Sequence, residues 1–208
     1  HAGSLASGDP AASTAATTLM NYHSLYYDFG NPPLIFNFRS GEVGNEESYG
    51  PVKSNIDKVL ADYIKADGAD VGISMTVEGD EDNILCAAQI KVAVDGKYYV
   101  NAWLLESDIY SPKQNGATDD VHRWYHFALR NFSEDVTKTD IKGLEIGELK
   151  AGDKYNYACS IDIPSTKWDW ENMGVLVVVS ATNDKVRTEV VNSAYCHIGD
   201  ELPFEYIE

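Results

Sequence analysis

Positive charge is scarce in this sequence of 208 residues. Sixteen lysine and arginine residues stand against thirty-three aspartate and glutamate residues, which gives a formal net charge of −17. A protein that binds nucleic acid needs cationic groups to displace the counterions of the phosphate backbone, so this composition argues against that class. It also disfavours docking on anionic lipid headgroups. We therefore expect partners that are neutral or cationic.

Long apolar runs are absent as well. No run approaches the roughly 20 residues that cross a bilayer, so we expect no transmembrane span in this chain. The sequence begins at His1, with no initiator Met, basic segment or apolar leader before the first helical pattern. We expect a fragment of a longer protein, and the alternative is a chain from which a leader has been removed.

Cysteine is sparse and its spacing is uninformative about metals. Cys86, Cys159 and Cys196 lie far apart in the sequence, without a C-x-x-C among them, and fit no zinc template. An odd number leaves at least one thiol unpaired. We expect buried small side chains within strands, and a bridge between two of the three stays open.

The start of the chain has a helical pattern. Asp9 and Pro10 offer an N-cap and a first-turn proline, and apolar residues then recur at helical spacing through residues 11–29. Gly30 supplies the predicted end.

A short strand and a second helix are expected next. The apolar residues 34–38 predict a strand directly after Pro32 and Pro33. The following helix opens at Ser54 as N-cap, carries its apolar residues on one face and ends near Gly68.

From about residue 70 the apolar period changes from 3.6 to 2, which is typical of strands. Asp95-Gly96 predicts a hairpin turn, and Asn183-Asp184 predicts the turn of the last hairpin. The spacing indicates an antiparallel immunoglobulin-like sandwich of about seven strands, expected at residues 70–79, 83–94, 97–109, 123–132, 154–163, 173–182 and 186–198. The fold class is thus α+β in two parts, residues 1–69 and residues 70–208.

Several segments resemble a known family. "YYVNAWLLESDIYSPKQNG", "DDVHRWYHFALRNF" and "VRTEVVNSAYCHIGD" are similar to the C-terminal sandwich of Bacteroidetes outer-membrane surface lipoproteins of the Omp-twenty-eight-like family. "GNPPLIFNFR" resembles that family's Gly-x-Pro segment, with Asn37 and Arg39 in approximate register. The residues that match its "lvEd…Q.nG…H…vlR" pattern are Leu105, Glu106, Asp108, Gln114, Asn115, Gly116, His126, Leu129 and Arg130.

This resemblance implies a thioredoxin-like domain followed by an immunoglobulin-like sandwich. Residues 1–69 would form the C-terminal half of the thioredoxin-like domain, without its C-x-x-C. Pro32 matches the cis-proline that lies against the redox dithiol in that fold. The strand at 34–38 would lack sheet partners, so we expect it to pair with another chain or to be covered by the sandwich. The parent protein is expected to follow a secreted route and to be lipid-anchored at the outer membrane or cell surface.

His122, His126 and Asp120 are weak candidates for a metal site, since imidazole and carboxylate groups ligate divalent ions. On a strand, residues four apart lie about 13 Å from each other, too far to share an ion. We therefore expect His126 to pack within the sandwich and His122 to lie in a loop. No metal or other cofactor is predicted.

Two further groups of side chains suggest chemistry. Glu106 and Asp108 share a strand face, as paired carboxylates for acid–base work would, but Asp108 comes at a strand end, and we predict no catalytic residue. Trp168 and Trp170 alternate in "TKWDWEN", so both point the same way and are candidates for a platform that stacks on a sugar. Packing at the core or at a strand edge is the alternative for them.

The preferred hypothesis is a non-enzymatic cell-envelope module for binding or adhesion, whose partner is an unknown protein or glycan at the cell surface. The first alternative is a thiol–disulfide oxidoreductase whose C-x-x-C lies on a missing N-terminal segment, with Pro32 as its remaining active-site element. The second alternative is a carbohydrate-binding module.

Overall fold

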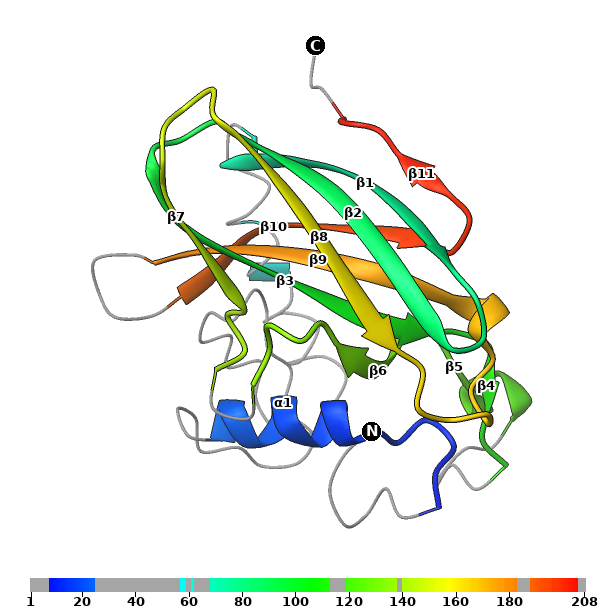
Figure 1. The fold of residues 1–208 in the computed structure, drawn as a ribbon. Coiled ribbons are helices and arrows are strands. Elements are labelled where there is room, and N and C mark those ends of the chain that lie inside the picture. The colour runs from blue at the N-terminus through cyan, green and yellow to red at the C-terminus, as the bar shows by residue number, and fades with distance from the viewer. Residues whose placement is uncertain are drawn as a thin grey trace.

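The fold is built mainly of antiparallel strands. The computed structural model describes residues 8–24, 57–58, 61, 68–112, 119–137, 140–182 and 188–205. Two sheets pack face to face around an apolar core, and helix α1 (Thr14–Ser24) lies beneath them in Figure 1. The expected β-rich, sandwich-like architecture is therefore confirmed.

One sheet has four strands and the other has five, all paired antiparallel. The four-stranded sheet has the order β11 (Glu201–Leu202), β1 (Val71–Gly79), β2 (Asn83–Val92), β8 (Lys154–Asp162). The five-stranded sheet has the order β10 (Thr188–His197), β9 (Met173–Thr182), β3 (Gly96–Glu106), β6 (Ala128–Phe132), and β7 (Leu144–Leu149) pairs with the first half of β3. A small ribbon joins β4 (Ile109–Tyr110) to β5 (Trp124–Tyr125).

Strict alternation fixes which face of the four-stranded sheet is buried. Along β1, every second residue from Val71 to Val77 lies in the core, while Ser74, Thr76 and Glu78 point outward. Because successive side chains of a strand point to opposite faces, this pattern leaves one whole face of the sheet at the surface.

Strand β3 is buried on both faces. Its even-numbered residues from Tyr98 to Leu104 belong to the sandwich core. Asn101 points the other way and is also fully buried. Its Nδ2 donates to the carbonyls of Ile141 and Lys142 at 2.6 and 3.0 Å, so these two residues lie against it. The segment between β6 and β7 thus covers the outer face of the five-stranded sheet at this point.

The hairpin predicted at Asp95-Gly96 is wrong. Strand β2 pairs with β1 and β8, whereas β3 pairs with β9, β6 and β7, so this turn carries the chain from one sheet to the other. The Asp95 carboxylate instead accepts hydrogen bonds from the Ala151 N–H at 2.8 Å and from Lys150 Nζ at 3.1 Å. It ties the β2–β3 crossover to the neighbouring β7–β8 crossover.

The last hairpin is confirmed in its pairing, because β9 and β10 are antiparallel neighbours. Its turn, with Asn183-Asp184, lies outside the described residues. The single strand predicted at 123–132 is wrong, since β5 and β6 are separated at Phe127, whose φ of 56° is left-handed. Strands β4, β7 and β11 come in addition to the seven predicted.

Helix α1 begins later than predicted. Ser13 is its N-cap, because its Oγ accepts a hydrogen bond from the Ala16 N–H at 3.0 Å. Asp9 forms an earlier turn, in which its Oδ1 accepts from the Ala11 N–H at 2.9 Å. None of the helices in the described part of the chain is long and apolar enough to span a membrane.

Most of residues 25–67 lies outside the described residues. This holds for Pro32, for the strand predicted at 34–38 and for the predicted end of the first helix at Gly30. Within the second predicted helix, Asp57, Lys58 and Ala61 are helical. The thioredoxin-like half and the boundary at residue 70 therefore stay predictions.

Candidate functional site

The weak metal candidates do not assemble into a site. His126 is 55% exposed at its side chain, so the prediction that it packs within the sandwich is wrong, and its Nδ1 lies 3.2 Å from Asp108 Oδ1. Asp120 is exposed in the short 3-10 helix η2 (Asp120–Arg123), with its Oδ1 3.6 Å from Arg123 Nη1. The side chain of His122 lies outside the described ones. Among the residues that are described, no group of three or more His, Cys, Asp and Glu is placed to hold a metal ion.

The two candidate tryptophans are half-buried. Trp168 and Trp170, the latter opening the 3-10 helix η3 (Trp170–Asn172), both pack against the sandwich core. The guanidinium of Arg130 lies 5.1 Å from the centre of the Trp168 ring, a cation–π contact that occupies this face of the indole. Packing at the core, the alternative that we considered, describes these two side chains.

Glu106 and Asp108 do not act as a pair. Glu106 is buried at the end of β3, while Asp108 lies beyond that end, with a left-handed φ of 58° and an exposed carboxylate. Each has a basic partner of its own, because Glu106 bonds Arg130 and Asp108 lies against His126. Four residues of the family-like pattern thus form two pairs, Glu106 with Arg130 and Asp108 with His126.

The inner pair is fully used by structural contacts. Arg130 Nε donates to Glu106 Oε2 at 2.6 Å, and Arg130 Nη1 donates to the Pro10 carbonyl at 2.8 Å. The second carboxylate oxygen of Glu106 accepts from the Asp169 N–H at 3.1 Å. Such a network satisfies both buried charges and holds three separate segments together, so it leaves neither group for catalysis.

The three cysteines, distant in sequence, gather in the core. Cys86 on β2 stands directly opposite Cys159 on β8, and all three thiols are free. The hydrogen bond to Cys159, together with burial, raises the pKa of Cys86 well above its ordinary value. Burial also raises the pKa of Cys196. The expected role of buried small side chains in strands fits Cys86 and Cys196.

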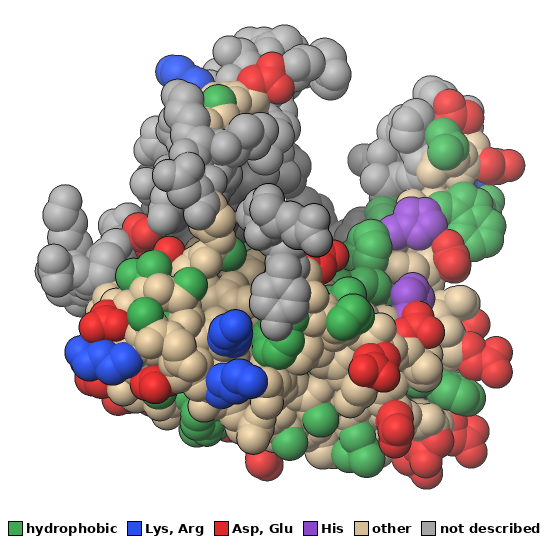
Figure 2. Space-filling model, turned by 90° about the horizontal axis from the view of Figure 1, so that it is seen from above, with side chains coloured by type: hydrophobic (Ala, Val, Ile, Leu, Met, Phe, Trp, Pro, Cys, Tyr) green, Lys and Arg blue, Asp and Glu red, His purple; other side chains and the backbone are tan. Residues whose placement is uncertain are grey.

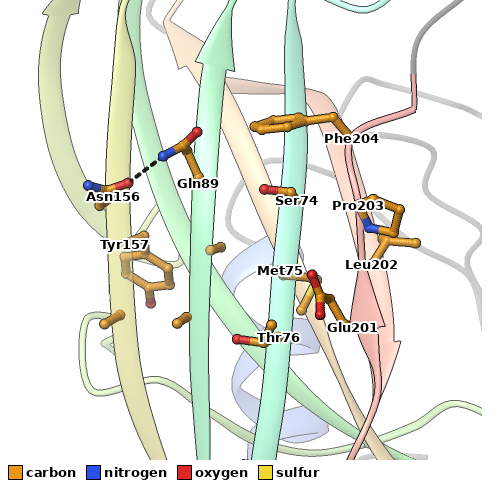
Figure 3. A pocket seen from close by; sticks show the side chains of 13 residues that line it. Ser74, Met75, Thr76, Gln89, Asn156, Tyr157, Glu201, Leu202, Pro203 and Phe204 are labelled. Atoms are coloured by element: carbon orange, nitrogen blue, oxygen red, sulfur yellow. Dashed lines mark hydrogen bonds between the residues drawn. The ribbon is translucent and has the colours of Figure 1, made fainter.

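A groove of about 560 Å³ crosses the outer face of the four-stranded sheet. Figure 3 shows its polar side chains: Gln89 donates from its amide nitrogen to Asn156 Oδ1 at 3.0 Å, and its carbonyl oxygen points towards β1. The hydroxyls of Ser74 and Thr76 point towards β2. The thirteen residues that line the groove are Ser74, Met75, Thr76, Ala87, Ala88, Gln89, Asn156, Tyr157, Ala158, Glu201, Leu202, Pro203 and Phe204.

The register of the sheet explains why a groove forms there. Thr76 pairs with Ala87, and Ala87 pairs with Ala158, so small side chains stand side by side across three strands. In the next row of the same face, Gln89 pairs with Asn156 and rises above them. A low row beside a taller row makes a trough that runs across the strands.

The remaining wall comes from the C-terminal segment after β10. Strand β11 pairs with β1 through Thr76 and Glu201, which brings Leu202, Pro203 and Phe204 along the edge of the groove (Figure 3). A Cβ on Gly72 would come within 3.3 Å of the Phe204 ring, so the ring lies directly on the backbone there. Sequence reasoning missed this site, because its rows join residues of the β1–β2 hairpin to residues of β8 and β11 far along the chain.

Acidic side chains gather at one end of the molecule. Figure 2 shows them mainly on the right, where Figure 1 has the β1–β2 and β10–β11 turns. Asp80, Glu81 and Asp82 are exposed in the first turn, and Asp200 and Glu201 in the second. The second turn is tied to β1 near the first one, since the Val77 N–H donates to the Asp200 carbonyl at 3.2 Å. The groove therefore adjoins an acidic end.

Comparison with known proteins places the chain in no family. No family model matches it, and no similar curated protein is found. One solved structure that matches is a selenomethionine-labelled beta-glucosidase from Kluyveromyces marxianus, with 13% sequence identity and a TM-score of 0.28. The match covers 64% of this chain and 15% of that one. A likeness this low carries no argument about fold or function.

Proposed function

We propose that this chain is a non-enzymatic binding module of a cell-envelope protein, and that the groove on its four-stranded sheet holds the ligand. The observation that carries the proposal is the groove itself. Ligand sites are concave and mostly apolar, with a few placed polar groups, and this groove combines an alanine floor with Gln89, Asn156 and Glu201.

The contacts of the buried acid and base in the described residues favour binding over catalysis. In the described part of the chain, the buried acid and base, Glu106 and Arg130, are committed to each other and to backbone groups. A general acid or base has to reach the proton that it transfers, and these two side chains are only 5% and 2% exposed.

The envelope location belongs to the same proposal. It is supported by the resemblance of the sequence to outer-membrane surface lipoproteins, in which residues 70–208 would be the immunoglobulin-like sandwich and residues 1–69 the end of a thioredoxin-like domain. The net charge of −17 is consistent with a surface exposed to neutral or cationic partners.

Binding of fluorescently labelled chain to intact Bacteroidetes cells and to their isolated envelopes tests the proposal. We expect saturable binding that Ala87→Trp abolishes, because an indole on the floor fills the groove. Leu85→Trp is the matched control, since Leu85 is on the same strand and face, is 54% exposed and does not line the groove. Circular dichroism checks that both variants fold.

Two results would overturn the proposal. One is binding that both tryptophan variants leave intact, which would remove the groove from the function. The other is the absence of any saturable binding to cells and envelopes.

A further inference from the structure

We infer that the ligand of this groove is a neutral glycan. The inference rests on the proposed function, because it names the class of ligand for the same groove.

The lining excludes a strongly anionic ligand. Its thirteen residues include no Lys, Arg or His, and Glu201 is the one carboxylate among them. The Tyr157 phenol lies in the core, where its hydroxyl donates to Asp135 at 3.0 Å. A phosphate or uronate in the groove would meet a carboxylate with no cation to offset it. Lys91 and Lys154 pair with each other one row beyond Gln89 and Asn156, outside the lining.

The polar groups suit hydroxyls. A sugar hydroxyl both donates and accepts a hydrogen bond, and the groove presents both kinds of partner. The Gln89 carbonyl oxygen and the Glu201 carboxylate accept, whereas the hydroxyls of Ser74 and Thr76 do either. These groups come from β1, β2 and β11 and surround the alanine floor.

The shape of the floor suits a flat ring. Thr76, Ala87 and Ala158 stand on three neighbouring strands, which are spaced about 4.8 Å apart, so the low row is about 10 Å wide. Pro203 and the Phe204 ring supply apolar surface at one side, against which the C–H groups of a pyranose can pack.

The pairing of the strands argues against a peptide bound as an added strand. Strand β1 pairs with both β11 and β2, and β2 pairs with both β1 and β8. The ladder groups of β1 and β2 are therefore used within the sheet, whereas β8 is the edge strand of the described sheet and pairs with β2. An extended peptide lying across this face would gain no main-chain ladder from β1 or β2. A compact ligand that is bound through side chains does not need main-chain hydrogen bonds from the sheet.

Isothermal titration separates these ligands. The probes are oligosaccharides of glucose, galactose, mannose and N-acetylglucosamine, the anionic polymers polygalacturonate and heparin, and a basic peptide. We expect binding of at least one neutral oligosaccharide, loss of that binding in Ala87→Trp, and no binding of the anionic polymers at physiological salt.

The two amide side chains of the groove, Gln89 and Asn156, give a finer test with a matched control. Gln89→Ala and Asn156→Ala should each weaken binding of the neutral oligosaccharide by about 3- to 10-fold, the loss of one net hydrogen bond. Asn83→Ala is the control. Asn83 makes a similar cross-strand bond from β2 to Ser160 on β8, at 2.6 Å, outside the groove. It should leave the affinity unchanged.

The outcomes distinguish this inference from the function on which it rests. Groove-dependent binding to envelopes, with no binding of any neutral oligosaccharide, would overturn the inference of a glycan ligand. So would groove-dependent binding of heparin or of the basic peptide. In both cases the proposed function as a binding module would stand. Binding of a neutral oligosaccharide that the three groove variants leave unchanged would also overturn the inference.

Discussion

Glu106 and Arg130 form a buried ion pair that joins strands β3 and β6 to two distant segments of the chain. Arg130 Nε lies 2.6 Å from Glu106 Oε2, with both side chains almost completely enclosed. Through this pair, β3 and β6 hold the N-terminal segment at Pro10 and the loop at Asp169. Pro10 and Asp169, which lie 159 positions apart in the sequence, are thus both held by this pair.

Removal of one partner should be strongly destabilising. Arg130→Met leaves the Glu106 carboxylate buried without its counter-charge, which typically costs about 3–5 kcal/mol of the free energy of unfolding. The double variant Glu106→Leu/Arg130→Met removes both charges and should be more stable than Arg130→Met alone. Urea denaturation of the two proteins checks this order. A double variant that is less stable than the single one would contradict it.

Phe127 is held in a conformation that phenylalanine avoids. Its φ is 56°, it is 58% exposed, and its ring packs edge-on against Tyr195 at 5.1 Å. A left-handed backbone at such a residue costs about 1–3 kcal/mol, whereas an aromatic pair contributes about 0.5–1.5 kcal/mol.

These magnitudes predict different results for two substitutions. Phe127→Asn relieves the strain, since asparagine tolerates the left-handed region, and should change the free energy of unfolding little. Phe127→Ala loses the ring and keeps most of the strain, so it should be less stable than Phe127→Asn by about 1 kcal/mol. Thermal unfolding of the two variants gives the comparison. Equal stabilities would show that the backbone at this position is unstrained.

Two of the buried thiols should be unreactive in the folded protein. The pKa of Cys86 is raised by its hydrogen bond to Cys159 and by burial, and the pKa of Cys196 is raised by burial. Because the thiolate is the reactive form, both residues should resist iodoacetamide at pH 8. The same chain in urea should be alkylated at both positions, as peptide mass spectrometry would show. Fast labelling of Cys86 under native conditions would contradict this placement.

The sequence was informative about strands and much less so about their partners. Alternation correctly indicated β1 and β2, because each has one buried and one exposed face. Asp95-Gly96 was misread as a hairpin, since a turn motif reports a change of direction and not which sheet the next strand joins. Strand β3 is buried on both faces and pairs on both sides, so its partners are set by the whole core.

The groove could not be predicted for the same reason. Ser74 and Thr76 are visible as outward residues of β1, yet the floor exists only because Thr76, Ala87 and Ala158 fall into one row. A shift of register by one residue would place core side chains there instead. By contrast, Glu106 and Arg130 were both noted in the sequence, as part of a family-like pattern, and Glu106 also as a possible carboxylate pair with Asp108. The ion pair between Glu106 and Arg130 was not predicted.

Asp95, in the turn between β2 and β3, should make the free energy of unfolding depend on pH. The Ala151 N–H, and then Lys150, lower the pKa of Asp95 below its ordinary value. A carboxylate whose pKa is lower in the folded state stabilises the protein above its unfolded pKa of about 3.9, and this contribution is lost as the pH falls through the folded value. Asp95→Asn should therefore unfold at a lower urea concentration than the wild type at pH 7, and the difference should disappear at about pH 2.

Asp82→Asn is the control for Asp95→Asn, because it removes one negative charge from an exposed turn without touching a crossover. Urea midpoints measured from pH 7 down to pH 2 should show a pH-dependent loss for Asp95→Asn that Asp82→Asn lacks. If the two variants follow the same curve, the effect belongs to net charge, and the bonds from Asp95 to the β7–β8 turn contribute nothing measurable. A loss that persists at low pH would instead assign it to the neutral hydrogen bonds, since a protonated carboxyl and an amide carry no charge towards Lys150.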